Sequence, residues 1–568
     1  MSHSASRRDF VIKLAALSAA GTSGLTLSAC GGGDDAPPAF QYGVASGDPL
    51  SDRVILWTHA RYPDRSEAVP LVWEVSTDNA FQQIVSQGQT QASADHDFTV
   101  KVDATGLVAN REYFYRFRVG RHVSPVGRTR TLPTGSVSEV KLAVFSCANY
   151  PAGFFNVYAE AARSDAQFAV HLGDYIYEYG ATNADGSPAY ASANAAALGR
   201  VSQPAQELTL LSHYRLRHAQ YKSDPDSKAL HARMPMIAVW DDHEIANDAY
   251  KDGADNHDPQ TEGSFADRKQ AALQAYHEWM PIRTGSDPAV IYRSFDFGQL
   301  LSLHMLDTRL IGRDQQVGFG DLLNPATAST AQATLASPTR QLLGSTQLGW
   351  LQGQMAQSGA TWQVLGQQVL MGNMAFPISV LSTLEGGDVT AAAQAVTDYL
   401  TAKATPEGAR TETQQALMSQ PKLGYNLDAW DGYPAARETV LMTAYQLQKP
   451  IITLAGDTHN AWHSDLKLAG YVNSALAGTQ VGAEFATASV SSPGLEEYLS
   501  AIPSVQVKAI FENVVDDLKW MDPSRRGFLK MTFTPTSVIG DWVFVNTISA
   551  RQYTVAETVR HVYPAQPV

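Results

Sequence analysis

The stretch KLAVFSCANYPAGFFNVYAEAARSDAQFAVHLGDYIYE, residues 141–178, decides the fold. It contains two short apolar runs separated by an amphipathic segment, which predicts a strand, a helix and a second strand. The first run ends at Cys147 and the second ends in Gly173-Asp174. In an open α/β sheet, ligands bind at the carboxyl ends of the strands, because the loops that leave the buried sheet there share one crevice. Both runs therefore end on a side chain that can bind a metal.

The rest of the C-terminal part continues this alternation of strand and helix patterns, which predicts an α/β domain. Apolar runs typical of strands buried on both faces occupy residues 236–240, 300–306, 362–370 and 451–454. Helical periodicity with polar faces occurs at residues 208–222 and 265–279. Residues 326–336 and 389–420 are interpreted as helical or looped insertions, and 527–548 as strands that close one edge of the sheet.

The N-terminal part carries short strand-like runs at close spacing, at residues 54–57, 71–76, 98–102, 113–119 and 128–132. Such spacing, with turn residues between the runs, predicts a small β-sandwich of fibronectin or immunoglobulin type. We place this domain at residues 40–135 and the α/β domain at residues 136–568. The sandwich holds no catalytic grouping, so we interpret it as structural.

The chain begins with a pattern typical of an export signal at residues 1–30 and a polar linker at residues 31–39. SRRDFV at residues 6–11 precedes a moderately apolar segment, as in twin-arginine signals. LSAC at residues 27–30 resembles a bacterial lipobox, in which case Cys30 would be lipidated. We therefore expect export by the twin-arginine machinery, to the periplasm or the cell surface, with a lipid anchor at Cys30 as one option.

Composition limits the function classes. The chain has 568 residues, of which 44% are hydrophobic and 17% are charged, so it can bury a large core. Its net charge of −14 argues against a nucleic-acid-binding surface, which needs basic stripes. There are two cysteines. If Cys30 is lipidated, Cys147 is a lone thiol, either a packed core residue or a ligand; a disulfide between the two is the third option.

Four of the predicted strands are followed directly by side chains that can bind metal. These are Cys147; Asp174 with Tyr177; Asp241, Asp242, His243 and Glu244; and Asp457 with His459. A single acidic residue after a strand can be a turn or a cap, and a tyrosine can simply pack. Adjacent carboxylates such as Asp241 and Asp242 repel each other unless a cation or a base lies between them. Four such places on one edge therefore favour a shared site.

Several motifs together carry a family resemblance. In order, SCANY, HLGDYIYEYG, WDDHEIANDAY, LDTRL, WQVLGQQV and LAGDTH resemble the alkaline phosphatase D (PhoD-type) family. FQYGVASGDPLSDRVILWTH resembles the N-terminal module of that family, so the resemblance covers the chain from about residue 40 to the C-terminus. It implies the calcineurin-like, four-layer αββα metallophosphoesterase fold and hydrolysis of phosphate esters, with residues 136–568 as the catalytic domain.

The resemblance also implies a ligand set. Cys147, Asp174, Tyr177 and His459 would hold a first metal, and Asp174 would bridge to a second metal bound by Asp242 and Asp457. The wider superfamily has Asp where this chain has Cys147 and Asn where this chain has Asp242. The PhoD-type enzymes have the same Cys and Asp as this chain. A further histidine ligand of the superfamily is missing here. Gln367 and Gln368 stand near its position, and Asn247 is a reserve candidate.

Donor chemistry narrows the choice of metals. Thiolate and phenolate are strongly donating anions that suit ferric iron, whereas carboxylate, amide and water suit a hard cation such as calcium. The resemblance implies the same pair, Fe³⁺ with Ca²⁺. Zinc and manganese remain alternatives.

A mechanism follows as a hypothesis. Two cations about 4 Å apart lower the pKa of a bridging water, and the resulting hydroxide attacks the phosphate in line. His243 would stand on the leaving-group side, to donate a proton or stabilise charge, unless it only supports a ligand through a hydrogen bond. Arg309 would orient the phosphate with its guanidinium fork or, alternatively, form a structural salt bridge.

We therefore expect an exported, monomeric alkaline phosphatase or phosphodiesterase that hydrolyses phosphate esters. One alternative keeps the site and changes the substrate, a phospholipase-D-like phosphodiesterase that acts on phospholipid headgroups. The other alternative is a non-catalytic, metal-stabilised binding lipoprotein.

Overall fold

A computed structural model describes residues 39–64, 66–385 and 389–565, and its centre is the unit predicted at residues 141–178. Strand β9 (Val140–Phe145) leads through helix α1 (Asn156–Arg163) into the parallel strand β10 (Phe168–His171). Strand β11 (Met236–Ala238) lies parallel to β10 on its other side. The three strands end at the same edge of the sheet, as the sequence predicted.

These strands occupy the middle of a nine-stranded sheet. Its order is β23 (Val555–Pro564), β22 (Ser537–Val545), β21 (Gly527–Phe533), β9, β10, β11, β1 (Val44–Gly47), β2 (Arg53–His59) and β5 (Thr99–Thr105). The run predicted at residues 527–548 forms β21 and β22. The edge itself is β23, which was not predicted because its mostly exposed residues give it little apolar signal.

A second sheet of seven strands faces the first. Its order is β12 (Arg293–Phe297), β13 (Leu301–Met305), β14 (Trp362–Gly366), β17 (Ile451–Ala455), β19 (Gln480–Ala486), β18 (Ala461–Lys467) and β20 (Leu518–Asp522). Neighbours from β13 to β19 run parallel. The predicted runs at 300–306, 362–370 and 451–454 correspond to β13, β14 and β17.

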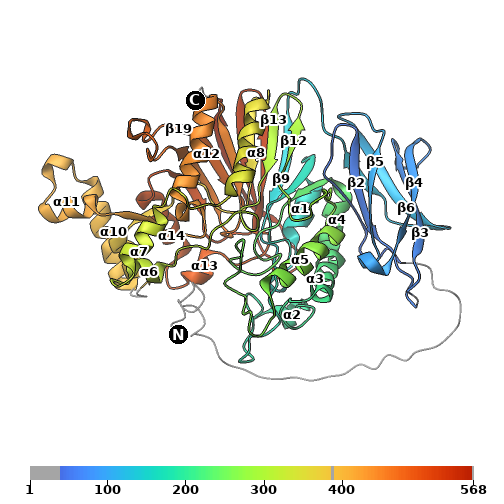
Figure 1. Ribbon diagram of the computed structural model, residues 1–568, viewed down its shortest axis with the longest axis horizontal. Coiled ribbons are helices and arrows are strands. Elements are labelled where there is room, and N and C mark those ends of the chain that lie inside the picture. Colours follow the sequence, from blue (N-terminus) through green and yellow to red (C-terminus); the bar gives the residue numbers. More distant parts are fainter. Residues whose placement is uncertain (1–38, 65, 386–388, 566–568) are drawn as a thin grey trace.

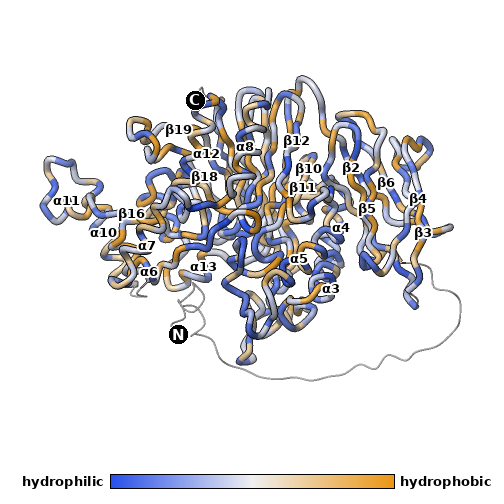
Figure 2. The backbone as a smooth tube through the Cα atoms, viewed as in Figure 1, coloured by the Kyte–Doolittle hydropathy of each residue, from blue (hydrophilic) through white to orange (hydrophobic). Residues whose placement is uncertain are grey.

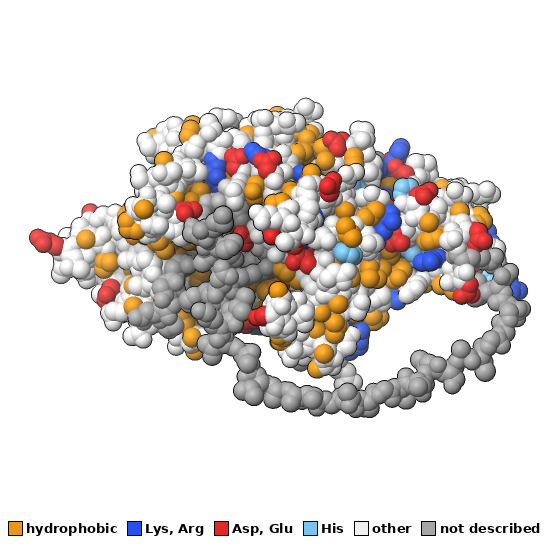
Figure 3. Space-filling model, turned by 60° about the horizontal axis from the view of Figure 1, so that its bottom comes forward, with side chains coloured by type: hydrophobic (Ala, Val, Ile, Leu, Met, Phe, Trp, Pro, Cys, Tyr) orange, Lys and Arg blue, Asp and Glu red, His pale blue; other side chains and the backbone are white. Residues whose placement is uncertain are grey.

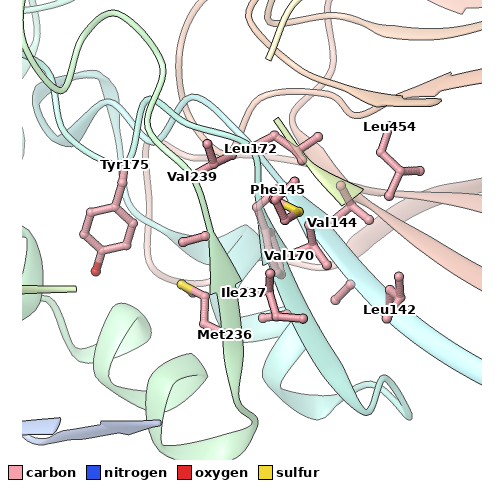
Figure 4. Packing of buried hydrophobic residues seen from close by; sticks show 14 of the residues in the cluster. Leu142, Val144, Phe145, Val170, Leu172, Tyr175, Met236, Ile237, Val239 and Leu454 are labelled. Carbon is pink, nitrogen blue, oxygen red and sulfur yellow. The ribbon is translucent and has the colours of Figure 1, made fainter. Parts of the chain in front are cut away.

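The two sheets pack face to face around one large apolar cluster, to which both contribute. Figure 4 shows Val144, Val170 and Ile237 side by side on neighbouring strands of the first sheet, with Leu454 of the second sheet near them. Along the chain, hydrophobic residues concentrate on the central strands and hydrophilic residues on the peripheral loops (Figure 2). Burial of this apolar surface is the main force that holds the sheets together.

Helices cover the outer faces of both sheets, which completes the predicted four-layer αββα sandwich (Figure 1). Helices α1, α3 (Leu211–Ser223), α4 (Pro225–Arg233) and α5 (Phe265–Trp279) join the cluster of the nine-stranded sheet. Helices α8 (Gly344–Gln357), α12 (Pro434–Leu447) and α14 (Ser504–Val514) pack on the seven-stranded sheet. The pattern at residues 265–279 predicted α5 with the observed bounds.

The predicted insertions are largely helical. They contain α7 (Ala328–Leu335), α10 (Val389–Ala404) and α11 (Glu412–Ser419), and the unpredicted helices α6 (Phe319–Leu323) and α9 (Ile378–Glu385) precede them. The short elements α2 (Ala195–Leu198), α13 (Leu495–Tyr498), β15 (Ala375–Pro377) and β16 (Lys422–Gly424) lie in loops. Helices α10 and α11 lie at the end of the molecule opposite to the N-terminal strands (Figure 1).

The N-terminal strands form the predicted β-sandwich, but it is not separate from the α/β domain. One layer contains β3 (Val69–Ser76), β4 (Ile84–Ala92), β6 (Glu112–Val119), β7 (His122–Val123) and β8 (Gly127–Arg130). The other layer is β1, β2 and β5, and an apolar cluster that includes Val54, Leu71 and Tyr115 fills the space between the layers. Gly47 of β1 pairs with Met236 of β11, so the two domains share one sheet.

The export motif and Cys30 lie outside the described residues. Among the residues that the structure does describe, helices lack the combination of length and apolar character required to cross a membrane.

Candidate metal centre

The candidate ligands meet where the two sheets come together at the carboxyl ends of their strands. Cys147 follows β9, Asp174 follows β10, Asp242 follows β11, and Asp457 follows β17 of the other sheet. Close approach is needed there. A Cβ on Gly173 would lie 2.3 Å from the Cβ of Asp241, and a Cβ on Gly456 would lie 2.5 Å from that of Ser146. The glycines of HLGD and LAGD therefore let the ligand loops converge.

The backbone at this edge is held in a rarely used conformation. Left-handed φ angles occur at Cys147 (60°), Asp174 (53°), Asp457 (60°) and His459 (66°). Non-glycine residues adopt this region at a cost of order 1–3 kcal/mol each, and they do so mainly where the surrounding structure enforces it for function. Four of the six candidate ligands thus carry a conformation that aims their side chains at the cost of local stability.

One group of donors brings together Cys147, Asp174 and His459, whose ligand atoms all lie within 4.8 Å of one another. Tyr177 completes it, because its hydroxyl lies 2.9 Å from Asp174 Oδ2 and 3.2 Å from His459 Nε2. These are the four residues that the family resemblance assigns to the first metal.

The hydrogen bonds of His459 fix its tautomer. Its Nδ1 lies 2.6 Å from the carbonyl oxygen of Pro493, which can only accept, so Nδ1 carries the proton. Burial lowers the pKa of His459 to about 3, so the ring is neutral. Nε2 therefore presents a lone pair to the group, as a metal-ligating histidine must.

A second group contains Asp241, Asp242 and Asp457, again within 4.8 Å of one another. Arg309 lies among them. Its Nε is 2.5 Å from Asp241 Oδ1, its Nη2 is 2.8 Å from Asp457 Oδ1, and its Nη1 is 2.7 Å from Asp428 Oδ2. The Arg309 side chain is 0% exposed. The structure thus places Arg309 in a salt-bridge network, the alternative to a phosphate-orienting role that the sequence left open.

Negative groups outnumber positive ones in this cluster. Burial, together with the nearby carboxylates, raises the pKa of Asp174 well above its usual range, and burial with Asp174 does the same to the pKa of the Cys147 thiol. Burial raises the pKa of Asp457 to about 6. Asp242 differs, because Arg309 and His243 overcome its burial and lower its pKa.

The donor set fits bound cations. Oδ1 of Asp174 and Oδ2 of Asp241 are buried and have no hydrogen-bond partner among the described residues. A buried carboxylate oxygen without a partner is costly, and a cation would satisfy it and favour the charged form of every neighbouring acid.

A third group joins Asp174 and Asp242 to His243. His243 Nδ1 lies 2.6 Å from Glu178 Oε2, and its ring packs on Tyr177 with centroids 4.2 Å apart. Glu178 also accepts hydrogen bonds from the Asn247 backbone and the Asn256 amide. Glu178 therefore fixes the orientation of His243.

Glu178 and Asp428 were not among the residues predicted at the site, and Glu244 was named with the donors at the strand ends but given no role. Glu244 accepts hydrogen bonds from the backbone amides of Asp174, Tyr175 and Asp241, so it ties two ligand loops together. In the sequence, the WDDHE motif could have indicated Glu244, and the HLGDYIYE motif could have indicated Glu178. Asp428 lies in an insertion without any such motif.

Two of the three candidates for the missing histidine position, Gln367 and Gln368, have side chains that form hydrogen bonds within the protein. Gln368 donates to the carbonyl oxygens of Trp240 and Leu306 and accepts from Thr308, so both ends of its amide are occupied. Gln367 accepts from Trp430 Nε1. Asn247 contributes its backbone amide to Glu178.

Comparisons with known proteins show the family to which this chain is similar. The profile of the PhoD-like phosphatases matches residues 142–542, and that of the PhoD-like phosphatase N-terminal domain matches residues 27–133. Alkaline phosphatase D of Bacillus subtilis (strain 168) is 36% identical over 472 residues, which are 80% of this chain and 70% of that protein. A solved structure of PhoD matches with a TM-score of 0.73 at 30% identity, over 94% of this chain and 92% of that one.

Fold and site together define an α/β phosphoric ester hydrolase built on two facing sheets. Within that class, the chain belongs to the PhoD-like phosphatase family. The resemblance seen in the sequence is thereby confirmed, and the alternative of a non-catalytic binding protein loses its support.

Proposed function

We propose that this chain is a metal-dependent alkaline phosphatase or phosphodiesterase whose catalytic centre is the cluster around Asp174. The observation that carries the proposal is the convergence of buried acids on Asp174 without enough positive charge to balance them. Perturbed acids gathered at one edge of a sheet are typical of functional sites.

The donor atoms support two different cations. Cys147, Asp174, Tyr177 and His459 would hold ferric iron, because thiolate and phenolate oxygen favour it. Asp242 and Asp457, with Asp174 shared, offer only carboxylate oxygens and would hold calcium. When bound, the cations would supply hydroxide near neutral pH and bind the phosphate oxygens.

The protein's own residues orient the reaction. Because Glu178 accepts from Nδ1 of His243, the Nε2 atom is the one able to carry a proton to the departing alcohol. Arg309 holds Asp241 and Asp457 in place from a fully buried position, which keeps the carboxylate cluster from spreading under its own repulsion.

The substrate class follows from the relatives. One of them is named alkaline phosphatase D, which supports phosphate esters as substrates. Nitrophenyl phosphate, bis-nitrophenyl phosphate and a detergent-dispersed phospholipid, assayed side by side, separate monoesterase, diesterase and headgroup hydrolase activities. Hydrolysis of the lipid alone would favour the phospholipase alternative, and hydrolysis of none of the three would overturn the proposal.

We also propose export through the twin-arginine machinery, with Cys30 as a lipid anchor. The support is the SRRDFV motif and the LSAC sequence before a polar linker. Fractionation of cells that express the full chain should find it outside the cytoplasm, and Arg7→Lys with Arg8→Lys should retain it inside. Unchanged location of that variant would contradict the export route, and solubility of the exported protein without detergent would contradict the anchor.

A further inference from the structure

A cavity lies at the junction of the β-sandwich and the α/β domain, away from the metal centre. Its volume is about 310 Å³, and its lining includes Asn110 and Arg130 of the sandwich together with Val140, Gln167 and Phe168. Val140 and Phe168 begin β9 and β10, whereas Cys147 and Asp174 follow the ends of the same strands. The cavity is therefore separated from the metal centre by the length of the strands, roughly 15–20 Å.

A smaller cavity of about 20 Å³ continues the first and shares Arg130 and Gln167 with it. Arg128, Arg233 and Glu112 also line it. Three arginines thus surround this junction, two from β8 of the sandwich and one from the end of α4. Such a concentration is unexpected in a chain with a net charge of −14.

The nearby carboxylates do not use up these arginines. Glu112 lies 3.0 Å from Arg128 Nε, and Glu139 lies 2.9 Å from Lys141. Arg130 donates to the neutral amide oxygen of Asn110 at 2.7 Å. Nη1 of Arg233 is buried and has no hydrogen-bond partner among the described residues. A buried guanidinium donor without a partner is costly, so a ligand that accepts hydrogen bonds would stabilise it.

The electrostatics point the same way. Burial lowers the pKa of Arg130 and that of Arg233; the positive charge of Arg128 lowers both further, and the negative charge of Glu112 raises both. Arg128 is therefore close enough to the other two guanidinium groups to repel each of them, and Glu112 offsets part of that repulsion. An anion between them would relieve the repulsion from both sides of the domain junction.

We propose that this junction is a binding site for a phosphate group, separate from the catalytic centre. Guanidinium forks match the paired oxygens of phosphate; Arg130 faces the larger cavity, and Arg128 and Arg233 face the smaller one that adjoins it. Gln167 accepts from the Lys141 amide through Oε1, which leaves its Nε2 as a donor on the lining. The volume is at the lower end for ligand pockets, which suits a small ion.

The proposal relies on the proposed function only for the supply of ligand, because a phosphatase releases inorganic phosphate. A phosphate group on a small organic ester has the same chemistry. Bound at the junction, either would connect β8 of the sandwich with the α4 end of the α/β domain.

The test is equilibrium binding of inorganic phosphate to the full-length holoenzyme by calorimetry. The wild type should show two classes of site, one at each centre. Asp174→Asn should abolish the catalytic class and keep the junction class. Arg130→Gln with Arg233→Gln should weaken the junction class by about 10-fold or more and keep the catalytic class. Arg53→Gln, in the same sandwich but paired with Asp52 outside the cavity, is the matched control and should keep both.

A variant that conserves charge guards against misfolding. Arg233→Lys keeps the charge and loses the fork, so its junction affinity should fall between those of the wild type and the double variant. Glycerol phosphate, titrated into Asp174→Asn that holds inorganic phosphate, distinguishes the two ligands. Displacement of inorganic phosphate supports an organic phosphate ester as the ligand, and no displacement supports inorganic phosphate. If Asp174→Asn binds no phosphate, or if the double variant binds it as the wild type does, the junction site does not exist. Loss of the catalytic class alone would count against the proposed function only.

Discussion

The metal centre and the junction between the two domains treat buried acids in opposite ways. At the junction, the fully buried Asp48 is held by both nitrogens of the Arg293 fork, at 2.6 and 2.9 Å, and by the backbone amide of Arg283. Arg283 in turn holds Asp103 through a second fork. At the metal centre, four carboxylates lie around the buried Arg309, and one of them, Asp428, is also paired with the buried Arg313.

This difference indicates the source of the positive charge that the metal centre lacks. The same chain balances its acids with arginines where the purpose is to join two domains. It leaves Asp174 with an unpartnered oxygen, a strained backbone and acidic neighbours where the purpose is chemistry. A buried charge without a partner is retained only when something else compensates it. We infer that cations do so.

The largest expected effect comes from Asp174→Asn. Activity should fall about 10³-fold or more, because the shared ligand of both proposed cations is lost. Once the metals are removed by chelation, the substitution should have a favourable effect on stability, in contrast to its effect on activity. The chelated variant should unfold with a free energy about 1–3 kcal/mol higher than the chelated wild type, because repulsion in the cluster is relieved. Denaturant unfolding of both proteins measures this, and a chelated variant less stable than its parent would contradict the charge argument.

The next effect concerns the proton donor. His243→Gln should lower kcat by about 10²–10⁴-fold and change KM little. Glu178→Gln keeps the hydrogen-bond acceptor for Nδ1 and removes the charge, so its kcat should fall less, about 10- to 100-fold, with a shifted pH profile. Substrates with better leaving groups should restore the kcat of both variants. A leaving-group dependence identical to that of the wild type would remove His243 from that role.

At the junction, Asp48→Ala should cost stability and not chemistry. It leaves Arg293 without its fork partner, which should lower the free energy of unfolding by about 3 kcal/mol. Asp48→Asn keeps one acceptor and should cost less. Activity per folded molecule should be unchanged in both, as measured by assay and thermal unfolding on the same samples. A loss of bound metal in either variant would contradict the claim that Asp48 contributes to stability and not to the metal centre.

Glu484 shows a third treatment, a buried carboxylate stabilised by neutral donors. It accepts from the backbone amides of Met371 and Gly372 and from the Thr453 hydroxyl, and burial raises its pKa to about 7. Its folded pKa lies above its usual 4.5, so the folded state binds more protons between these values, and stability falls as pH rises through that window. Glu484→Gln removes this slope, so its stability relative to the wild type should rise from pH 4.5 to 7, by up to about 3 kcal/mol. A constant difference across that range would contradict the raised pKa.

The four-layer αββα arrangement was implied by the family resemblance, whereas the sequence pattern itself predicted the α/β class, because strands buried on both faces leave continuous apolar runs. It failed where that signal is weak. Strands β4 and β23 are mostly exposed, so their apolar residues do not form a continuous buried run, and neither strand was predicted. The shared sheet depends on a single pairing between Gly47 and Met236, and pairing between distant segments leaves no local pattern.

For the site, motifs at strand ends named the residues that the structure brings together, since topology forces such ends onto one edge. The role of Arg309 could not be read in the same way. Its partners Asp241, Asp428 and Asp457 are distant in sequence, and only the folded chain shows that they occupy its guanidinium. Glu178 was equally hidden, because its contact with His243 needs both loops in place.

Both regions bury charge, but Asp48 is balanced by arginines of the chain itself, whereas the acids of the metal centre need cations from outside the chain. Elemental analysis of the purified full-length protein, with its visible spectrum, therefore tests the central claim most directly. We predict bound iron and a second metal, a phenolate-to-iron absorption band that disappears in Tyr177→Phe, and loss of activity when the metals are removed. A colourless, metal-free protein that remains fully active would contradict the account.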